Sequence, residues 1–559
     1  MRVICIFILM LAICSCTQNQ KEETHFTNPI LAGFYPDPSI CKVGEDYYLT
    51  TSTFTYFPGL PIFHSKDLVN WKLIGHVLNK PEIFNVEGSG VSRGLFAPSI
   101  RYDSGLFYVV CTLIDRGGNF FSTAKNPAGP WSDPVWIPQV EGIDPSTFFD
   151  DDGKAYLIYN SVAPNNAPLY EGHRTIRLRE FDKDSLIIVG EEVIVVNGGV
   201  DLSKKPIWIE APHIIKKDGF YYLICAEGGT GYNHSEVVFR SESVKGPYIP
   251  YDKNPILTQR HLDPNRPNPI TTTGHADFVE TDDGEWWAVF LGCRPYTDKD
   301  YYNIGRETFL APVKWIDGWP VINPDFEEVQ YSYPYPLPRV EYGSPKSGNF
   351  TFRDDFDDGE LNKEWMFLRA PKEKWYTVSQ GKLGIKVRPE TCIEKVNPSF
   401  VGYRQQHITS SAAASIDFTT QSENEKAGLL IYQSEYNFYF LCQSIKAGKR
   451  TVELYQSPFA MDSVMVQLAS AKLNDASSVQ LKIESNPEAY SFYYSETGGE
   501  WTLLKDNLDP KLLSTKIAGG FVGSVYAMYA TSQVESFNNT AWYDWFEYVG
   551  NDAVYHKVK

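Results

Sequence analysis

Three carboxylic acids occupy related positions in a repeated motif of this sequence. Asp37 and Asp144 each stand directly before a proline, and Glu210 stands two residues before the proline of another copy. Burying several carboxylates together is unfavourable unless the arrangement has a use. Hydrolysis of a glycosidic bond is one such use, because it needs a carboxylic acid and a carboxylate flanking the same bond. The alternative for a single Asp-Pro pair is a turn in which the aspartate caps nearby backbone groups.

The motif occurs five times, and each copy continues into a strand, a Gly or Asp turn and an aromatic strand. The copies cover residues 35–52, 96–112, 143–160, 209–227 and 274–292. Their starts are about 45 to 70 residues apart, the period of four-stranded propeller blades with their loops. We therefore predict an all-β fold with a five-bladed β-propeller over residues 26–325. Inner strands begin near the propeller axis, so Asp37, Asp144, Glu210 and His275 of the fifth copy would meet there.

The rest of the chain divides into short segments and a second β domain. Residues 326–349 are rich in Pro, Gly and Tyr and predict a linker, and residues 350–559 predict a lectin-like β-sandwich. Residues 1–16 resemble a bacterial lipoprotein signal peptide, and residues 17–25 a polar tether. Acylation of Cys16 would anchor the protein to the membrane of the bacterial cell envelope, at the periplasmic face of the outer membrane or at the cell surface. The alternative is a plain secretory signal.

The composition of the chain indicates which partners and cofactors to expect. The net charge of −18 repels phosphate backbones, so we expect no nucleic-acid partner, whereas a neutral hemicellulose is compatible. Aromatic residues make up 14% of the chain; most would fill β cores, and others would offer flat surfaces to sugar rings. Beyond the N-terminal segment six cysteines are scattered without a CxxC pair, which favours buried free thiols. We infer no required cofactor, no metal site and no protein partner.

Five motifs, taken in order, resemble those of glycoside hydrolase family 43. They are Tyr35-Pro-Asp-Pro-Ser, Gly94-Leu-Phe-Ala-Pro-Ser, Gly142-Ile-Asp-Pro-Ser, Ile209-Glu-Ala-Pro-His and Ala226-Glu-Gly-Gly-Thr-Gly-Tyr-Asn-His-Ser. The resemblance implies that Asp37 is the general base, Glu210 the general acid and Asp144 the residue that orients the acid and adjusts its pKa. A neighbouring anion disfavours a second ionisation, so Asp144 would help to keep Glu210 protonated. A base that leaves room for water predicts inversion of configuration.

Other residues are candidates for substrate binding. Arg306 matches a family arginine that binds substrate hydroxyls; the alternative is an ordinary salt bridge with Glu307. His275 would hold a water or a cation in the central channel, or be a structural histidine. Phe54 and Phe96 would form part of the pocket wall.

The second domain and the choice of sugar complete the sequence-based hypothesis. The stretch that begins at Ala518 resembles the part of the appended sandwich that places a Phe at the pocket mouth, and Phe521 is the candidate; the alternative is a core Phe. A Phe521 ring at the pocket mouth would limit the pocket to one terminal sugar, which predicts exo action. The segment 163–182 resembles a branch of this family that contains arabinofuranosidases. The resemblance implies an α-L-arabinofuranosidase acting on plant hemicellulose side chains, with a β-D-xylosidase acting on xylo-oligosaccharides as the alternative. The alternative from another class is a glycan-binding lipoprotein without catalysis.

Overall fold

The computed structural model describes residues 24–296, 301–458, 464–474, 478–496, 498–533 and 538–557. Nearly all of the regular structure is β-sheet, as predicted, and the α-helix in this part of the chain is the short α1 (Thr515–Ala518). No helix among the described residues is long and apolar enough to cross a membrane. The predicted signal peptide, Cys16 and most of the tether lie outside these residues, so the lipid anchor stays a prediction.

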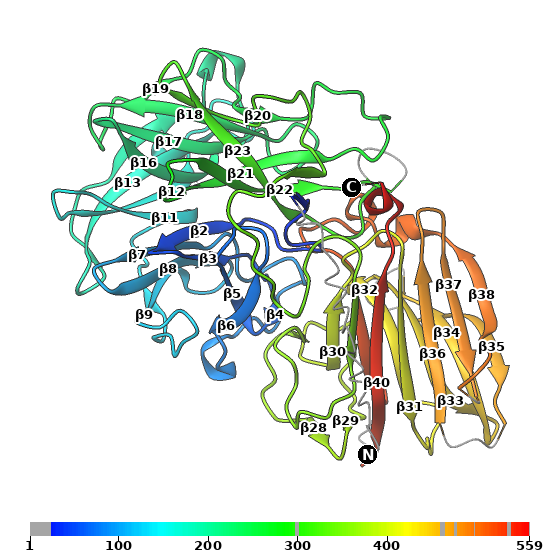
Figure 1. Ribbon diagram of the computed structural model, residues 1–559. Coiled ribbons are helices and arrows are strands. Elements are labelled where there is room, and N and C mark those ends of the chain that lie inside the picture. Colours follow the sequence, from blue (N-terminus) through cyan, green and yellow to red (C-terminus); the bar gives the residue numbers. More distant parts are fainter. Residues whose placement is uncertain are drawn as a thin grey trace, which may run out of the picture.

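Five sheets form the blades of a propeller (Figure 1), as predicted from the repeat. The first two blades contain β2 (Ser39–Val43), β3 (Asp46–Thr50), β5 (Gly59–Ser65) and β6 (Lys72–Leu78), then β7 (Ser99–Asp103), β8 (Leu106–Leu113), β9 (Gly118–Ala124) and β10 (Val135–Trp136). The third contains β11 (Ile143–Phe149), β12 (Ala155–Val162), β13 (Arg174–Asp182), β14 (Ile187–Ile188) and β15 (Val193–Asn197). The fourth contains β16 (Glu210–Lys217), β17 (Phe220–Glu227), β18 (Ser235–Ser241), β19 (Ile249–Pro250) and β20 (Leu257–Thr258). The fifth contains β21 (Thr271–Glu280), β22 (Trp286–Cys293), β23 (Glu307–Ile316) and β24 (Trp319–Ile322).

The innermost strands close the ring. Strand β2 contacts β7 and β21, while β11 contacts β7 and β16, and β16 contacts β21. The N-terminal segment is tied to the last blade by Asn28, whose side chain donates to the carbonyl of Leu310 (2.8 Å) and accepts from its amide (3.0 Å). Strand β1 (His25–Thr27) pairs with β25 (Ser332–Pro334), which lies within the segment predicted as a linker. This closure fixes the motif starts around one axis.

The second domain is a sandwich of two antiparallel sheets (Figure 1). One sheet contains β26 (Thr351–Asp354), β28 (Tyr376–Ser379), β29 (Lys382–Lys386), β31 (Ser410–Asp417), β36 (Ser478–Ser485), β37 (Tyr490–Ser495), β38 (Thr502–Leu508) and β40 (Thr540–Gly550). The other contains β30 (Ser399–Arg404), β32 (Lys426–Ser434), β33 (Asn437–Lys446), β34 (Lys449–Gln456), β35 (Val466–Lys472) and β39 (Val525–Thr531). In β36 buried residues alternate with more exposed ones, because successive side chains point to opposite faces of a sheet.

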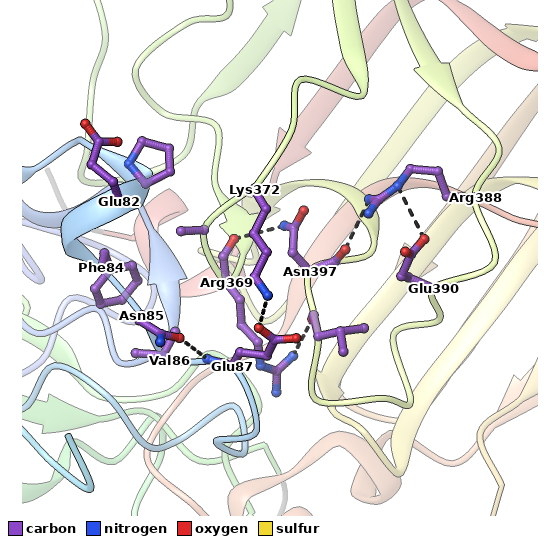
Figure 2. Close-up of a pocket in the computed structure, with 13 residues that line it drawn as sticks. Glu82, Phe84, Asn85, Val86, Glu87, Arg369, Lys372, Arg388, Glu390 and Asn397 are labelled. Atoms are coloured by element: carbon purple, nitrogen blue, oxygen red, sulfur yellow. Dashed lines mark hydrogen bonds and ion pairs between the residues drawn. The ribbon is translucent and has the colours of Figure 1, made fainter.

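The two domains share a continuous interface. Strand β4 (Tyr56–Phe57) of the propeller pairs with β27 (Phe367–Leu368) of the sandwich, and one apolar cluster contains residues of both domains. A cavity of about 370 Å³ lies between the propeller segment 81–87 and sandwich loops. Figure 2 shows the residues that line it. Its cations face carboxylates: the exposed Lys372 pairs with Glu87, and Nε of the partly buried Arg388 lies 3.3 Å from Glu390 Oε2. This cavity is a seam between the domains, away from the propeller axis.

The six cysteines beyond the N-terminal segment are buried and free, as predicted: Cys41, Cys111, Cys225, Cys293, Cys392 and Cys442.

Candidate active site

The repeated motif forms a backbone bulge at the axial end of the blades. Asp37, Asp144, Ala211 and His275 have left-handed φ angles of 56°, 51°, 51° and 54°. The pairing register shifts at this point in the third, fourth and fifth blades. A bulge re-aims the side chains around it, and a left-handed non-glycine residue is strained, a feature that concentrates at functional sites. In the fourth blade Ala211 takes this position, and the carboxyl comes from Glu210, one residue earlier.

A pocket of about 520 Å³ lies over these bulges, and all three carboxylic acids line it. Arg306, His275, Phe54, Phe96 and Phe521 line it as well. The structure therefore brings together every candidate catalytic and substrate-binding residue taken from the sequence. They come from all five blades and from the sandwich.

Asp37 is buried in an environment that favours its charged form. Arg306 Nη1 donates to Asp37 Oδ1 (2.9 Å), and Ser52 Oγ donates to Asp37 Oδ2 (2.5 Å). Burial alone would raise the pKa of Asp37, but the charge of Arg306 and the Ser52 hydrogen bond hold this pKa below its usual value. Asp37 is therefore an anion that can accept a proton.

Glu210 and Asp144 are placed in the opposite situation. Burial, followed by the charges of Asp144 and Asp37, raises the pKa of Glu210 well above its usual value. Burial and the charge of Asp37 also raise the pKa of Asp144 to about 7, while a backbone hydrogen bond from Ala211 opposes the rise. Because the two carboxyls repel a second negative charge, the pair retains a proton at neutral pH, and we assign it to Glu210.

Arg306 belongs to the pocket and not to a pair with its neighbour in sequence. Its guanidinium also donates to Thr230 Oγ1 (3.1 Å), whereas Glu307 pairs with Arg294 (Nε to Oε2, 2.6 Å). The alternative of a salt bridge between Arg306 and Glu307 is therefore wrong. The two residues are adjacent at the start of an extended strand, where successive side chains point to opposite faces.

Three phenylalanines form an aromatic wall of the pocket. Phe521 stacks on Phe54 (centroids 6.1 Å apart, 20° between planes) and meets Phe96 edge to face (5.8 Å, 78°). The guanidinium of Arg306 lies 5.4 Å from the Phe521 ring centroid. Phe521 is half-buried, whereas its neighbour Val522 is fully buried in the sandwich core. The structure places Phe521 at the pocket wall, where it packs against the edge of the core that contains Val522.

The backbone beside Phe521 approaches the propeller closely. The Phe521 amide donates to Ser92 Oγ (2.9 Å). Gly520 has a φ of 76°, and a Cβ there would lie 2.1 Å from Ser92 Oγ. Glycine is needed at this position for both reasons. The sandwich thereby completes the wall of a pocket that the propeller alone would leave open.

His275 is buried beside the base. Its Nδ1 lies 3.6 Å from Asp37 Oδ1, and burial lowers its pKa to about 4, so the ring is neutral at physiological pH. Within the described ranges no group of three or more His, Cys, Asp or Glu side chains could hold a metal ion. A cation near His275 stays a prediction.

Among the lining residues that were not identified as candidates from the sequence, four have polar or aromatic side chains: Arg93, Arg174, Trp208 and Thr230. Thr230 lies within the motif that begins at Ala226, so its position there was a usable signal. Trp208 stands two residues before Glu210 and remains 40% exposed. Arg93 directly precedes the motif that begins at Gly94, and Arg174 lies within the segment 163–182, but neither residue was singled out there.

Comparisons with known proteins agree with this architecture. The family model described as glycosyl hydrolases family 43 matches residues 26–320, and the model of the beta xylosidase C-terminal concanavalin A-like domain matches residues 353–549. A non-reducing end alpha-L-arabinofuranosidase of Bacteroides ovatus is 37% identical over 97% of this chain and 98% of its own. A xylosidase/arabinosidase of Butyrivibrio fibrisolvens is 36% identical over 93% and 98%. A xylan 1,3-beta-xylosidase of Vibrio sp. is 34% identical over 94% and 99%.

Solved structures share both domains with this chain. One named Bacteroides ovatus Xyloglucan PUL GH43B superposes with a TM-score of 0.84 at 38% identity, covering 94% of this chain and 99% of its own. A GH43_12 protein retrieved from a capybara gut metagenome superposes with a TM-score of 0.85 at 39% identity, covering 92% and 96%. Together these matches extend over propeller and sandwich.

Proposed function

Because the chain belongs to glycosyl hydrolase family 43 and is a glycosidase, we propose that it releases terminal α-L-arabinofuranose from plant hemicellulose side chains by exo-acting, inverting hydrolysis. One observation carries the proposed chemistry. In a single pocket the pKa of Asp37 is lowered and the pKa of Glu210 is raised. Carboxyls whose surroundings separate their pKa values in this way supply the base and the acid of a hydrolysis.

In the proposed reaction Glu210 donates its proton to the glycosidic oxygen, and the bond from this oxygen to the anomeric carbon breaks. A water attacks the anomeric carbon from the other side and gives a proton to Asp37. The new bond lies on the face opposite the old one, so the released sugar has inverted configuration. Arg306 holds Asp37 in place (2.9 Å).

The choice of sugar rests on two supports. The segment 163–182 favours an arabinofuranosidase, and the Bacteroides ovatus relative bears that name. The second candidate is a β-D-xylosidase acting on xylo-oligosaccharides, since the Vibrio relative and the C-terminal domain model carry names of that activity. The wall that Phe54, Phe96 and Phe521 form supports exo action, because a walled pocket accommodates a chain end.

A direct comparison tests the proposal. The purified protein is assayed on p-nitrophenyl α-L-arabinofuranoside and on p-nitrophenyl β-D-xyloside. We expect a higher kcat/KM on the arabinofuranoside. A higher kcat/KM on the xyloside would replace the proposed arabinofuranosidase by the second candidate, the β-D-xylosidase. Proton NMR of the first product from a natural linkage then reads the anomeric configuration. Net retention would contradict the role of Asp37 as a base.

A further inference from the structure

We infer that Trp208 and Arg174 form the subsite for the leaving group, the sugar unit to which the released residue is attached. This inference rests on the proposed function and extends it to the part of the substrate that stays behind. Both residues line the pocket. Trp208 takes no part in the acid–base chemistry described above, whereas the charge of Arg174 acts to lower the pKa values of Glu210 and Asp144, against the larger effect of burial.

Trp208 presents an indole to the pocket. It is 40% exposed, although tryptophan is among the residues that gain most from burial. The guanidinium of Arg174 lies 4.9 Å from the Trp208 ring centroid. An exposed aromatic side chain inside a concave site is a surface on which the apolar C–H face of a sugar can stack.

The backbone around Trp208 holds this indole in one place. The Trp208 amide donates to the carbonyl of Gly172 (2.9 Å), and the Gly228 amide donates to the carbonyl of Ile207 (2.9 Å). Trp208 itself has a left-handed φ of 53°, which persists only where the surroundings enforce it. The ring is therefore positioned before a ligand arrives, and binding costs little ordering entropy.

Arg174 adds hydrogen-bond donors beside this surface. Its Nε and Nη2 both donate to Asn160 Oδ1 (3.0 and 2.6 Å), and Asn160 is fully buried. The described residues offer no acceptor to Nη1. A fixed guanidinium with a donor to spare, next to an aromatic face, matches a sugar ring with hydroxyls at its edge.

The arrangement of the pocket assigns this pair to the leaving group. The base Asp37 lies with Arg306, and Arg306 lies against Phe54 and Phe521. The acid Glu210 instead follows Trp208 by two residues. Since the acid protonates the oxygen that departs, the sugar bearing this oxygen lies on the side of Glu210. The released sugar then occupies the side of Asp37 and the phenylalanine wall.

Two substrates with the same terminal sugar test the inference. Methyl α-L-arabinofuranoside has a leaving group too small to reach Trp208, while an arabinofuranosyl-substituted xylo-oligosaccharide fills the leaving-group side. Both have poor leaving groups and need the acid. We expect Trp208→Ala to lower kcat/KM on the oligosaccharide at least about tenfold, mainly through KM, and to change the methyl glycoside less than about twofold. Trp208→Phe keeps an aromatic ring and should therefore lower kcat/KM on the oligosaccharide less than Trp208→Ala does.

Trp136→Ala is the matched control. Trp136 is 39% exposed on β10, packs on Phe120 (5.2 Å) and does not line the pocket, so both substrates should be cleaved at wild-type rates.

Arg174→Lys should lower kcat/KM on the oligosaccharide alone. An equal loss of kcat/KM on both substrates, or no loss on either, would overturn the proposed subsite. A wild type inactive on the arabinofuranosides but active on methyl β-D-xyloside and xylobiose would overturn the choice of sugar, and this pair then tests Trp208 in the same way. Inactivity on all four would overturn the proposed function itself.

Discussion

Asp37 and Glu210 carry the same functional group in the same pocket, yet their surroundings move their pKa values in opposite directions. The difference comes from the partners. Asp37 has a cation and a hydroxyl donor within hydrogen-bond distance, whereas Glu210 has burial and two neighbouring carboxyls. Chemical roles at this scale are therefore set by a few contacts.

The acid role predicts a dependence on the leaving group. Glu210→Gln should lower kcat about 10²- to 10⁴-fold on natural linkages, because an amide cannot donate the proton that a poor leaving group requires. On p-nitrophenyl glycosides, whose leaving group departs without full protonation, the loss should be much smaller. Steady-state kinetics on both substrate types measure the contrast. Equal losses would remove Glu210 from the acid role.

The coupling between Asp144 and Glu210 predicts a shift in the pH profile. Activity requires ionised Asp37 and protonated Glu210, so kcat/KM should fall below the lowered pKa of Asp37 and above the raised pKa of Glu210. Asp144→Asn removes a neighbouring negative charge and lowers the pKa of Glu210. The alkaline limb should therefore move to lower pH.

Asp151→Asn is the control for this profile. Asp151 belongs to the same blade, but its side chain is 85% exposed in a turn away from the pocket. Its profile should overlay that of the wild type. An alkaline limb unmoved in Asp144→Asn would show that Asp144 does not act on the acid.

At the scale of elements, the bulge at the start of the inner strands and one loop of the sandwich do the positioning. A left-handed backbone with nearly the same φ recurs at Asp37, Asp144, Ala211 and His275, so a repeated local geometry directs unlike side chains to one axis. The loop after α1 brings Phe521 against Phe54 and closes the wall. The inner strands position the catalytic side chains, and the loop limits which substrates enter the pocket.

The loop predicts that Phe521→Ala changes kinetics more than stability. The side chain is half-buried at the pocket, so melting should stay near that of the wild type while KM rises, or kcat falls, about tenfold. Phe400→Ala is the matched control, because Phe400 is fully buried in the sandwich. It should cost about 3–5 kcal/mol in unfolding free energy and leave the kinetics of the folded fraction unchanged. If Phe521→Ala instead lowered the melting temperature sharply and left the kinetics of the folded fraction unchanged, Phe521 would be a structural residue of the sandwich.

At the scale of the whole molecule, the sandwich is part of the site as well as a neighbour of the propeller. Arg369 is buried and pairs with Glu435 (Nη2 to Oε1, 2.5 Å). The same pair holds the propeller: Arg369 Nη2 donates to the carbonyl of Ser89 (2.6 Å), and the Val91 amide donates to Glu435 (3.0 Å). Figure 2 shows Arg369 at the seam between the domains. The held segment leads directly to Arg93 and Phe96 of the pocket.

This junction predicts a large effect from one distant residue. Arg369→Met leaves Glu435 buried without its partner and should cost about 3–5 kcal/mol. Adding Glu435→Gln should recover part of that loss, since a neutral amide is cheaper to bury. Urea denaturation of both variants measures the change.

Arg353→Met provides the comparison. Arg353 pairs with Asp355 and Glu547 on the sandwich surface, where its side chain is 40% exposed, and its loss should cost at most about 1 kcal/mol. If Arg369→Met were as mild as this surface variant, the buried pair would not hold the domains together.

The repeat in the sequence was enough to predict the propeller and the meeting of Asp37, Asp144 and Glu210, and the pattern of short strands and turns after residue 350 predicted the sandwich. These features depend on local patterns: turns, strand alternation and a motif that recurs at blade spacing. A regular architecture converts equal positions in sequence into a common place in space. The candidate residues Arg306 and Phe521, taken from resemblance, also reach that place.

The tertiary structure alone decided the contacts between residues far apart in the chain. Arg306 binds Asp37 across 269 positions of sequence and leaves Glu307 to Arg294. Arg174 and Trp208 enter the pocket through packing that no motif records. Their positions, and the opposite pKa shifts of the carboxyls, follow from burial and from partners on other blades. Such quantities exist only once the chain has folded, because a sequence lists neighbours along the chain and not in space.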